Sequence, residues 1–362
     1  MNLLTVSLLL AAASSADATQ AEKMLALLSA PPGARSQRVD AVLAAHGTDL
    51  VVGQQNISRR VTREQYAEVL RAFAQGREPR LEPADAGERA RKGVDGLLKD
   101  VRPSLKWGAE NAAVLRERLS AIERLDLLTR ARETAARFLP DPVPLSPRVF
   151  VVAGGRAGAA ALDGGEIYFD VLAASYHAVA GTLAHYPTPD EQVEFVAHEV
   201  HHQGLGRILD DRRARLRLDS RGAKALDLLS SLDMEGSASY LINGHRDIEA
   251  MSKDPQFSEG LAHSGELIGL ARATLRRVLD EGLAGDAYDA AIAPMLGSGW
   301  HAAGAAMFAA IDRDGGLDAV MRAVRDPRGL LAAYDAAVMK SGGPAPSGGD
   351  AALSARLARL GD

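Results

Sequence analysis

Four prolines within eight residues constrain this chain more than any other feature of its sequence; they are Pro140, Pro142, Pro144 and Pro147. Proline fixes φ near about −65° and has no backbone N–H to donate, so this segment cannot continue a helix. Residues 20–137, which precede it, show helical periodicity almost throughout. We therefore expect a structural boundary near residue 140.

The residues after this boundary change in character. Residues 148–154 (RVFVVAG) and 166–171 (EIYFDV) have the apolar pattern of short strands, and the pattern is helical again from 189 to 340. Aromatic residues make up only 4% of the chain, so the core must consist mainly of Leu, Val and Ala, which suits packed helices. The predicted fold is mainly α with a small β-sheet, in the α+β class.

The two ends of the chain indicate export and a linker. Residues 3–13 form an apolar run that is too short to span a bilayer, which needs about 20 residues, and it leads into Ala16-x-Ala18, the pattern of a signal-peptide cleavage site. We expect an exported, periplasmic or secreted protein with no transmembrane segment in the mature chain; the alternative is a buried N-terminal helix. Residues 341–350 (SGGPAPSGGD) predict a flexible linker before a short amphipathic helix.

These features predict four segments: a signal peptide at 1–18, a helical region at 19–140, a second domain at 141–340, and a linker with a short helix at 341–362. The chain has no cysteine, which excludes disulfides, thiolate zinc sites, iron–sulfur clusters and cysteine nucleophiles. Its formal net charge of −5 argues against a nucleic-acid partner.

One motif carries the chemistry: residues 198–202, HEVHH, fit the pattern H-E-x-x-H. A helix is predicted to start just before it, because Thr188 and Glu191 form a capping box with proline at 189, and Gly204 is placed to end that helix. The alternative, a solvated helix that carries three histidines by accident, does not explain the apolar residues around the motif, which are Val193, Phe195, Val196, Ala197 and Val200.

On a helix, this spacing suits a metal ion. His198 and His202 would lie one turn apart, about 40° round the axis, so both imidazoles can reach one ion. Glu199 would lie beside that ion, where it can take a proton from water. Neutral nitrogen ligands with an open position and an adjacent base are what catalytic zinc needs. His201 is expected to be a neighbour of the site or a surface residue.

A third ligand must come from elsewhere in the chain. Leu205 and Ile208 replace the Gly and the final His of the extended H-E-x-x-H-x-x-G-x-x-H pattern, which excludes that arrangement. Glu235 is our preferred ligand, because it lies on a predicted helix and the small residues after it would let two helices approach closely. The alternative for Glu235 is an exposed helix carboxylate. The fallback ligands are Asp210, Asp211 and Glu194, of which Glu194 could instead orient His198.

The HExxH motif followed 33 residues later by Glu235-Gly236-x-Ala238 resembles the gluzincin metallopeptidases, in particular a group of little-characterised bacterial zinc-dependent peptidases. The resemblance implies a thermolysin-like catalytic core with one Zn²⁺ per chain, held by His198, His202 and Glu235, and with Glu199 as general base. It also implies that residues 166–171 are an edge strand on which an extended peptide or protein substrate binds by strand addition.

A third segment extends the resemblance. Residues 299–307 (GWHAAGAAM) are similar to a segment in which the family usually has Tyr at the position of His301. Gluzincins place a Tyr or His near the zinc to stabilise the oxyanion, so the resemblance implies this role for His301. Tyr240 and His245 are the alternatives, although Tyr240 also suits helix packing and His245 suits a helix C-terminus.

The sequence thus predicts an exported zinc peptidase that hydrolyses peptide bonds with a zinc-activated water and Glu199 as general base. Two alternatives remain open: a zinc-binding hydrolase that acts on another amide or ester, and a helical envelope binding or scaffold protein in which the HEVHH helix is not catalytic. The intact Glu199 argues against a non-catalytic metal protein, which has no use for a base there. Cleavage specificity and oligomeric state do not follow from the sequence.

Overall fold

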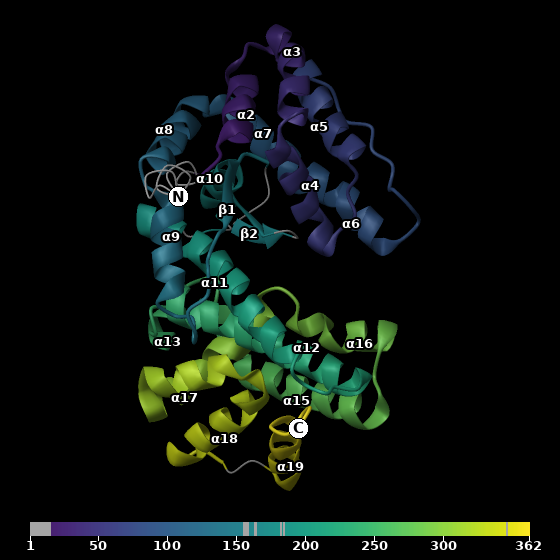
Figure 1. Cartoon of the computed structure of the whole chain (residues 1–362). Coiled ribbons are helices and arrows are strands. Elements are labelled where there is room, and N and C mark those ends of the chain that lie inside the picture. Colours follow the sequence, from purple (N-terminus) through teal and green to yellow (C-terminus); the bar gives the residue numbers. More distant parts are fainter. Residues whose placement is uncertain (1–15, 155–158, 163–164, 182, 184, 345–346) are drawn as a thin grey trace, which may run out of the picture. The chain divides into compact units, whose positions relative to one another are not determined.

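The computed structural model describes all of the chain except residues 1–15, 155–158, 163–164, 182, 184 and 345–346. Its described residues are mainly helical, with one small three-stranded sheet (Figure 1). The predicted α+β class is confirmed at this level. Most of the predicted signal peptide lies outside the described residues.

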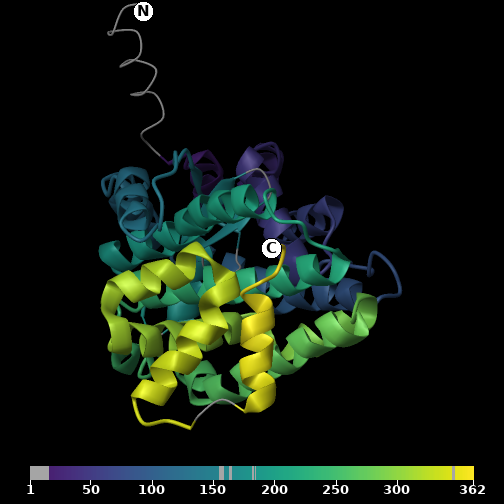
Figure 2. The same cartoon turned by 60° about the horizontal axis from the view of Figure 1, so that its bottom comes forward.

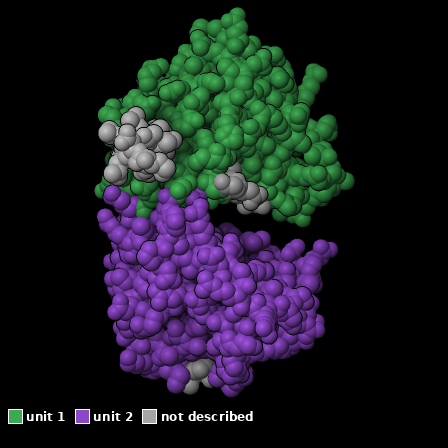
Figure 3. Space-filling view, in the orientation of Figure 1, with its two compact units in different colours: residues 1–132, 146–200 green, residues 133–145, 201–362 purple. Residues whose placement is uncertain are grey.

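The chain divides into two compact units, which Figure 3 shows in different colours. Unit 1 comprises residues 1–132 and 146–200, and unit 2 comprises residues 133–145 and 201–362. The expected boundary near residue 140 therefore does not separate compact units. The reason lies in unit 1, where strand β1 packs against the N-terminal helices α2 and α4 and so joins the sheet to the helices that precede the proline-rich segment.

Unit 1 combines helices with the sheet. Its helices are α2 (Thr19–Ser29), α3 (Pro32–Leu43), α4 (His46–Ser58), α5 (Arg63–Gln75), α6 (Glu88–Gly96), the π-helix η1 (Leu97–Val101), α7 (Arg102–Glu110), α8 (Ala112–Glu123), most of α9 (Leu127–Ala136), α10 (Val171–Ala180) and the first part of α11 (Pro189–Arg213). Local chemistry sets several of these ends. Thr62 and Gln65 form a capping box at the start of α5, which ends at Gly76 with a φ of 66°.

The sheet has the order β1-β3-β2, with β1 (Arg148–Val152) parallel to β3 (Glu166–Asp170) and β2 (Ala159–Leu162) antiparallel to it. The prediction that 166–171 is an edge strand was therefore wrong, because β3 is hydrogen-bonded on both sides and every one of its residues is buried. One edge strand is β2, for which the sequence analysis predicted no strand.

Residue Asp17 extends the other side of the sheet. Its N–H donates to the Val149 carbonyl and its carbonyl accepts from the Val151 N–H, each at 2.8 Å, which makes a parallel bridge to β1. Asp17 lies inside the predicted cleavage site, so a cut after Ala18 would remove this bridge.

Unit 2 is a helical bundle. Besides the second part of α11 it contains α12 (Ser220–Ala238), the π-helix η2 (Ser239–Asn243), α13 (Ile248–Met251), α14 (Ser258–Ala262), α15 (Ser264–Glu281), α16 (Gly285–Ile292), the 3₁₀ helix η3 (Ala293–Met295), α17 (Ser298–Arg325), the 3₁₀ helix η4 (Pro327–Gly329), α18 (Leu330–Lys340) and α19 (Gly348–Leu357). Leu, Ala, Val and Met side chains form its core, with α12 and α17 packed along one another.

The C-terminal helices close this bundle, as the yellow segments of Figure 2 show. Leu353 and Leu357 of α19 are buried in the core cluster, so the last helix is part of unit 2. The predicted linker at 341–350 is shorter than expected, because α19 already begins at Gly348. Within the described part of the chain, no helix combines the length and the apolar character needed to cross a membrane.

Candidate metal centre

The HEVHH motif lies on α11, whose start was predicted correctly. The Thr188 Oγ1 accepts a hydrogen bond from the Glu191 N–H at 3.3 Å, and the Thr188 N–H donates to Glu191 Oε2 at 2.7 Å. The predicted end at Gly204 was wrong, because α11 continues to Arg213. Gly204 packs closely against Leu139, since a Cβ at this position would lie 2.5 Å from Cδ1 of that side chain.

Three side chains in the described part of the chain form a group that could hold one metal ion: His198, His202 and Glu235. Each offers one ligand atom, and these atoms all lie within 4.8 Å of one another. His202 Nε2 lies 3.1 Å from Glu235 Oε2. Two ligands at about 2.1 Å from a tetrahedral zinc ion are about 3.4 Å apart, which is close to the distance between His202 and Glu235, and three donors fill three of the four positions of such an ion. The fallback ligands Asp210, Asp211 and Glu194 are not part of this group.

A close helix crossing positions Glu235. A Cβ at Gly236 of α12 would lie 2.3 Å from the Cα of Gly304 in α17, so the two backbones meet where only glycine fits. The expectation that small residues after Glu235 allow close helix packing is confirmed, and the partner helix is α17. His301 lies one turn before Gly304 and is thereby brought to the same place.

His301 contacts the third ligand directly. Its Nδ1 lies 2.9 Å from Ser239 Oγ and 3.3 Å from Glu235 Oε2. Ser239 opens the π-helix η2, and π-helical turns within helices are frequent at functional sites. Sequence reasoning missed Ser239, since neither its residue type nor its spacing distinguishes it.

Glu199 is held by the edge strand of unit 1. Its Oε2 accepts a hydrogen bond of 2.8 Å from the Ala161 N–H in β2. The carboxylate therefore has a defined orientation next to His198 on the same helix. This contact could not be predicted, because nothing in residues 159–162 (AAAL) indicates a strand whose backbone would donate a hydrogen bond to Glu199.

Tyr240 and His245 are the other two candidates for oxyanion stabilisation. The Tyr240 hydroxyl donates to Asp312 Oδ2 at 2.8 Å and lies 3.1 Å from the Arg246 carbonyl, while burial and the negative charge of Asp312 raise the pKa of the phenol. Tyr240 would have to break these bonds to donate to an oxyanion. His245 follows η2 in a left-handed backbone conformation with φ 47°.

Two buried polar residues accompany the metal group. His201, which was expected to be a neighbour of the site or a surface residue, is fully buried and therefore not a surface residue, and its Nε2 lies 3.2 Å from the Phe138 carbonyl. Asp233 is also fully buried, and neither of its carboxylate oxygens has a hydrogen-bond partner among the described residues. Burial, with a contribution from the charge of Asp326, raises its pKa well above the usual range.

Comparison with known proteins supports the chemistry of this group. A family profile described as "Putative zinc dependent peptidase (DUF5700)" matches residues 85–342, and this segment contains all three residues of the metal group. Neither the curated proteins nor the solved structures include a match to the chain. Because the profile covers more than half of the sequence, the chain belongs to this DUF5700 family.

Proposed function

We propose that the protein is an exported zinc-dependent peptidase with a gluzincin-like site. The observation that carries the proposal is the convergence of His198, His202 and Glu235 on one point, with Glu199 next to His198 on the same helix. A purely structural metal site would have no use for a carboxylate in that position, because structural zinc is enclosed by four protein ligands. The family match supports the same class of reaction.

Each side chain has a distinct part in the proposed mechanism. Zinc, when bound, supplies a Lewis acid and lowers the pKa of water towards about 7. Glu199 takes a proton from the attacking water and passes it to the leaving nitrogen of the peptide. The Ala161 N–H keeps the Glu199 carboxylate in one orientation throughout. We assign oxyanion stabilisation to His301, whose Nδ1 is positioned by Ser239 and Glu235 and whose other ring nitrogen would donate.

The peptide would bind along β2 rather than along β3. Strand addition needs a sheet edge, and β3 has strands on both of its sides. β2 is an edge strand, and its Ala161 N–H meets the general base. A peptide that pairs with β2 would therefore pass next to Glu199.

Export rests on the apolar run at 3–13 and the Ala16-x-Ala18 pattern. N-terminal sequencing of the protein recovered from the periplasm or medium would locate the cut. Cytoplasmic retention of the uncut chain would refute export and leave the peptidase proposal untouched.

The metal content of the purified protein tests the site. Wild type should retain about one zinc per chain after dialysis, and His202→Ala should lose it. His201→Ala is the matched control, since it removes the adjacent buried imidazole, which contacts a backbone carbonyl instead. Equal zinc content in wild type and His202→Ala would refute the ligand set.

The reaction is tested with a peptide mixture and Glu199→Gln. This variant should keep its zinc and lose peptide cleavage, because the amide cannot accept the proton of water. Turnover by Glu199→Gln at the wild-type rate would refute its role as the base. A wild-type protein that binds zinc but cleaves no peptide would favour the non-peptidase hydrolase.

A further inference from the structure

A pocket of about 380 Å³ lies in unit 2 beside the metal group, a volume within the range of small-ligand sites. Two polar pairs connect α11 and α12 on this side: His202 with Glu235, and Arg213 with Asp227. Glu235, Arg213 and Asp227 all line the pocket, so it lies along the space between the two helices. One of its walls is therefore a proposed metal ligand.

Small residues leave this space open. Gly206 of α11 lines the pocket, and a Cβ placed on it would meet no atom within 4 Å. Ser230 and Ser231 line it from α12. Apolar side chains complete the walls; they are Leu209, Leu226, Met234, Trp300 and Pro327.

The pocket lies on the same side of α11 as the general base. At 3.6 residues per turn, Gly206 and Asp210 each fall within about 20° of Glu199 round the helix axis, and Asp210 is about 16 Å farther along it. In the proposed mechanism the base lies on the substrate side of the metal. The face of α11 that carries Glu199 also carries Gly206 and Asp210, so the side of the helix that would contact substrate leads into the pocket.

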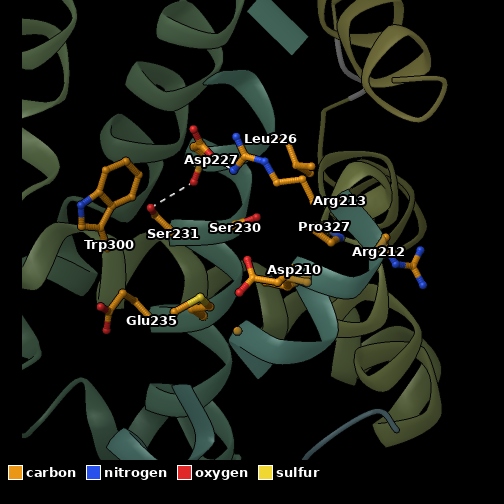
Figure 4. Close-up of a pocket in the computed structure, with 13 residues that line it drawn as sticks. Asp210, Arg212, Arg213, Leu226, Asp227, Ser230, Ser231, Glu235, Trp300 and Pro327 are labelled. Atoms are coloured by element: carbon orange, nitrogen blue, oxygen red, sulfur yellow. Dashed lines mark hydrogen bonds and ion pairs between the residues drawn. The ribbon is translucent and has the colours of Figure 1, made fainter. Parts of the chain in front are cut away.

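The charge of the pocket is set by Asp210. Figure 4 shows its carboxylate directed into the cavity and the Arg212 guanidinium directed away from it. Arg213 is paired with Asp227, and Arg212 with Asp326. Among the residues that the structure describes, no cation lies within ion-pair distance of Asp210, so Asp210 adds a negative charge to a lining that also contains Glu235 and the ion pair of Arg213 with Asp227.

We propose that this pocket binds a lysine or arginine side chain of the peptide substrate, which deepens the proposed peptidase function and rests on it. The apolar walls suit the methylene stem of such a side chain, and Asp210 suits its cationic end. An extended peptide rises about 3.3 Å per residue. The 16 Å between Glu199 and Asp210, about five such residues, therefore places the basic residue a few positions from the scissile bond, not beside it.

Binding to a variant that does not turn over tests this pocket. The protein is zinc-loaded full-length Glu199→Gln, and the probes are blocked alanine-based octapeptides that carry one arginine at a different position in each. A matched set carries citrulline, which keeps the shape and removes the charge. Calorimetry should show one arginine position that binds about tenfold more tightly than its citrulline counterpart, as expected for one charge-assisted contact.

Two variants in the same background assign that preference to the pocket. Asp210→Asn should abolish the arginine preference, while Asp211→Asn, which makes the same charge change at a neighbour that does not line the pocket, should keep it. Gly206→Leu should fill the pocket and weaken binding of both peptide sets. Gly269→Leu is its control, because a Cβ at this exposed glycine of α15 also meets nothing within 4 Å.

The outcomes separate this inference from the proposed function. Equal affinity for arginine and citrulline peptides, equal effects of Asp210→Asn and Asp211→Asn, or unchanged binding by Gly206→Leu would each overturn the pocket assignment. Peptide cleavage by wild type without any arginine preference would overturn it and leave the peptidase intact. The pocket assignment would be supported, and the peptidase proposal refuted, by two results together: Asp210→Asn removes the arginine preference, and the wild type cleaves no peptide.

Discussion

Replacement of Gly304 by alanine should disturb the metal group from a distance. A Cβ at Gly304 would lie 2.3 Å from the Leu232 carbonyl oxygen and 2.5 Å from the Cα of Gly236, whereas ordinary contacts are 3.4–4 Å. Both atoms belong to the backbone of α12 and cannot rotate away. The helices α12 and α17 must therefore separate by about 1 Å, since protein interiors are close-packed.

The cost follows from two opposing effects. Overpacking of this kind destabilises by about 1–3 kcal/mol, while alanine in place of glycine favours a helix by about 1 kcal/mol. We expect a net loss of up to about 2 kcal/mol, which corresponds to a decrease of up to about 8 °C in the melting temperature of a unit of this size. Glu235 and His301 flank the crossing, so a shift of about 1 Å should also weaken zinc binding by about tenfold.

The assay uses Trp107→Phe as background, because the chain has two tryptophans and only Trp300 then reports on unit 2. Thermal unfolding by fluorescence gives the stability, and competition with a chelator gives the zinc affinity. Gly265→Ala is the control, since a Cβ there meets nothing within 4 Å, and it should be neutral or slightly stabilising. If Gly304→Ala matches Gly265→Ala in both measurements, the glycine crossing does not position the site.

Three further predictions concern buried polar groups. Tyr240→Phe removes the hydrogen bond to Asp312, so its free energy of unfolding in urea should be about 1 kcal/mol lower, while its kcat should equal that of the wild type. A variant that is folded but inactive would show that Tyr240 is catalytic. Asp312→Asn should be about 1–2 kcal/mol less stable at pH 7, since Arg246 and Tyr240 lower the pKa of this carboxyl and stabilise its charged form. That deficit should disappear in acid, as the pH falls below about 3.8 and through the lowered pKa; a deficit independent of pH would contradict it. For Asp233 the pH dependence has the opposite sign, because burial raises the pKa of this carboxyl. Relative to Asp233→Asn, the free energy of unfolding of the wild type should therefore fall by about 1.4 kcal/mol per pH unit, from about pH 3.8 up to the pKa of Asp233 in the folded state. Parallel pH profiles of wild type and Asp233→Asn would refute a raised pKa of Asp233.

Local patterns were sufficient for the parts of the site that lie on one helix. The start of α11 follows from the capping box at Thr188 and Glu191, and the alignment of His198 with His202 follows from the helical period. Glu235 was found because a carboxylate before small residues suggested a close helix crossing. The family resemblance added His301, which contacts that carboxylate.

Other features depend on contacts between distant residues. Gly204 has the residue type of a helix end, yet α11 passes through it and packs against Leu139 there. Residues 166–171 have the pattern of any buried strand, and only pairing on both sides shows that β3 is central. The sequence left Tyr240 as a candidate for the site, but its hydroxyl donates a hydrogen bond to Asp312, 72 residues away in sequence.

The sequence by itself determined the helix that carries the HEVHH motif and singled out Glu235 as the partner of its histidines, because the helical period and the capping chemistry act within a few residues. The tertiary structure decided which strand is the edge, which glycines are packing contacts, how Glu199 is oriented, and where a pocket opens beside Glu235. These depend on how closely segments far apart in the chain approach, and such distances are set by the packing of the whole core rather than by any local pattern.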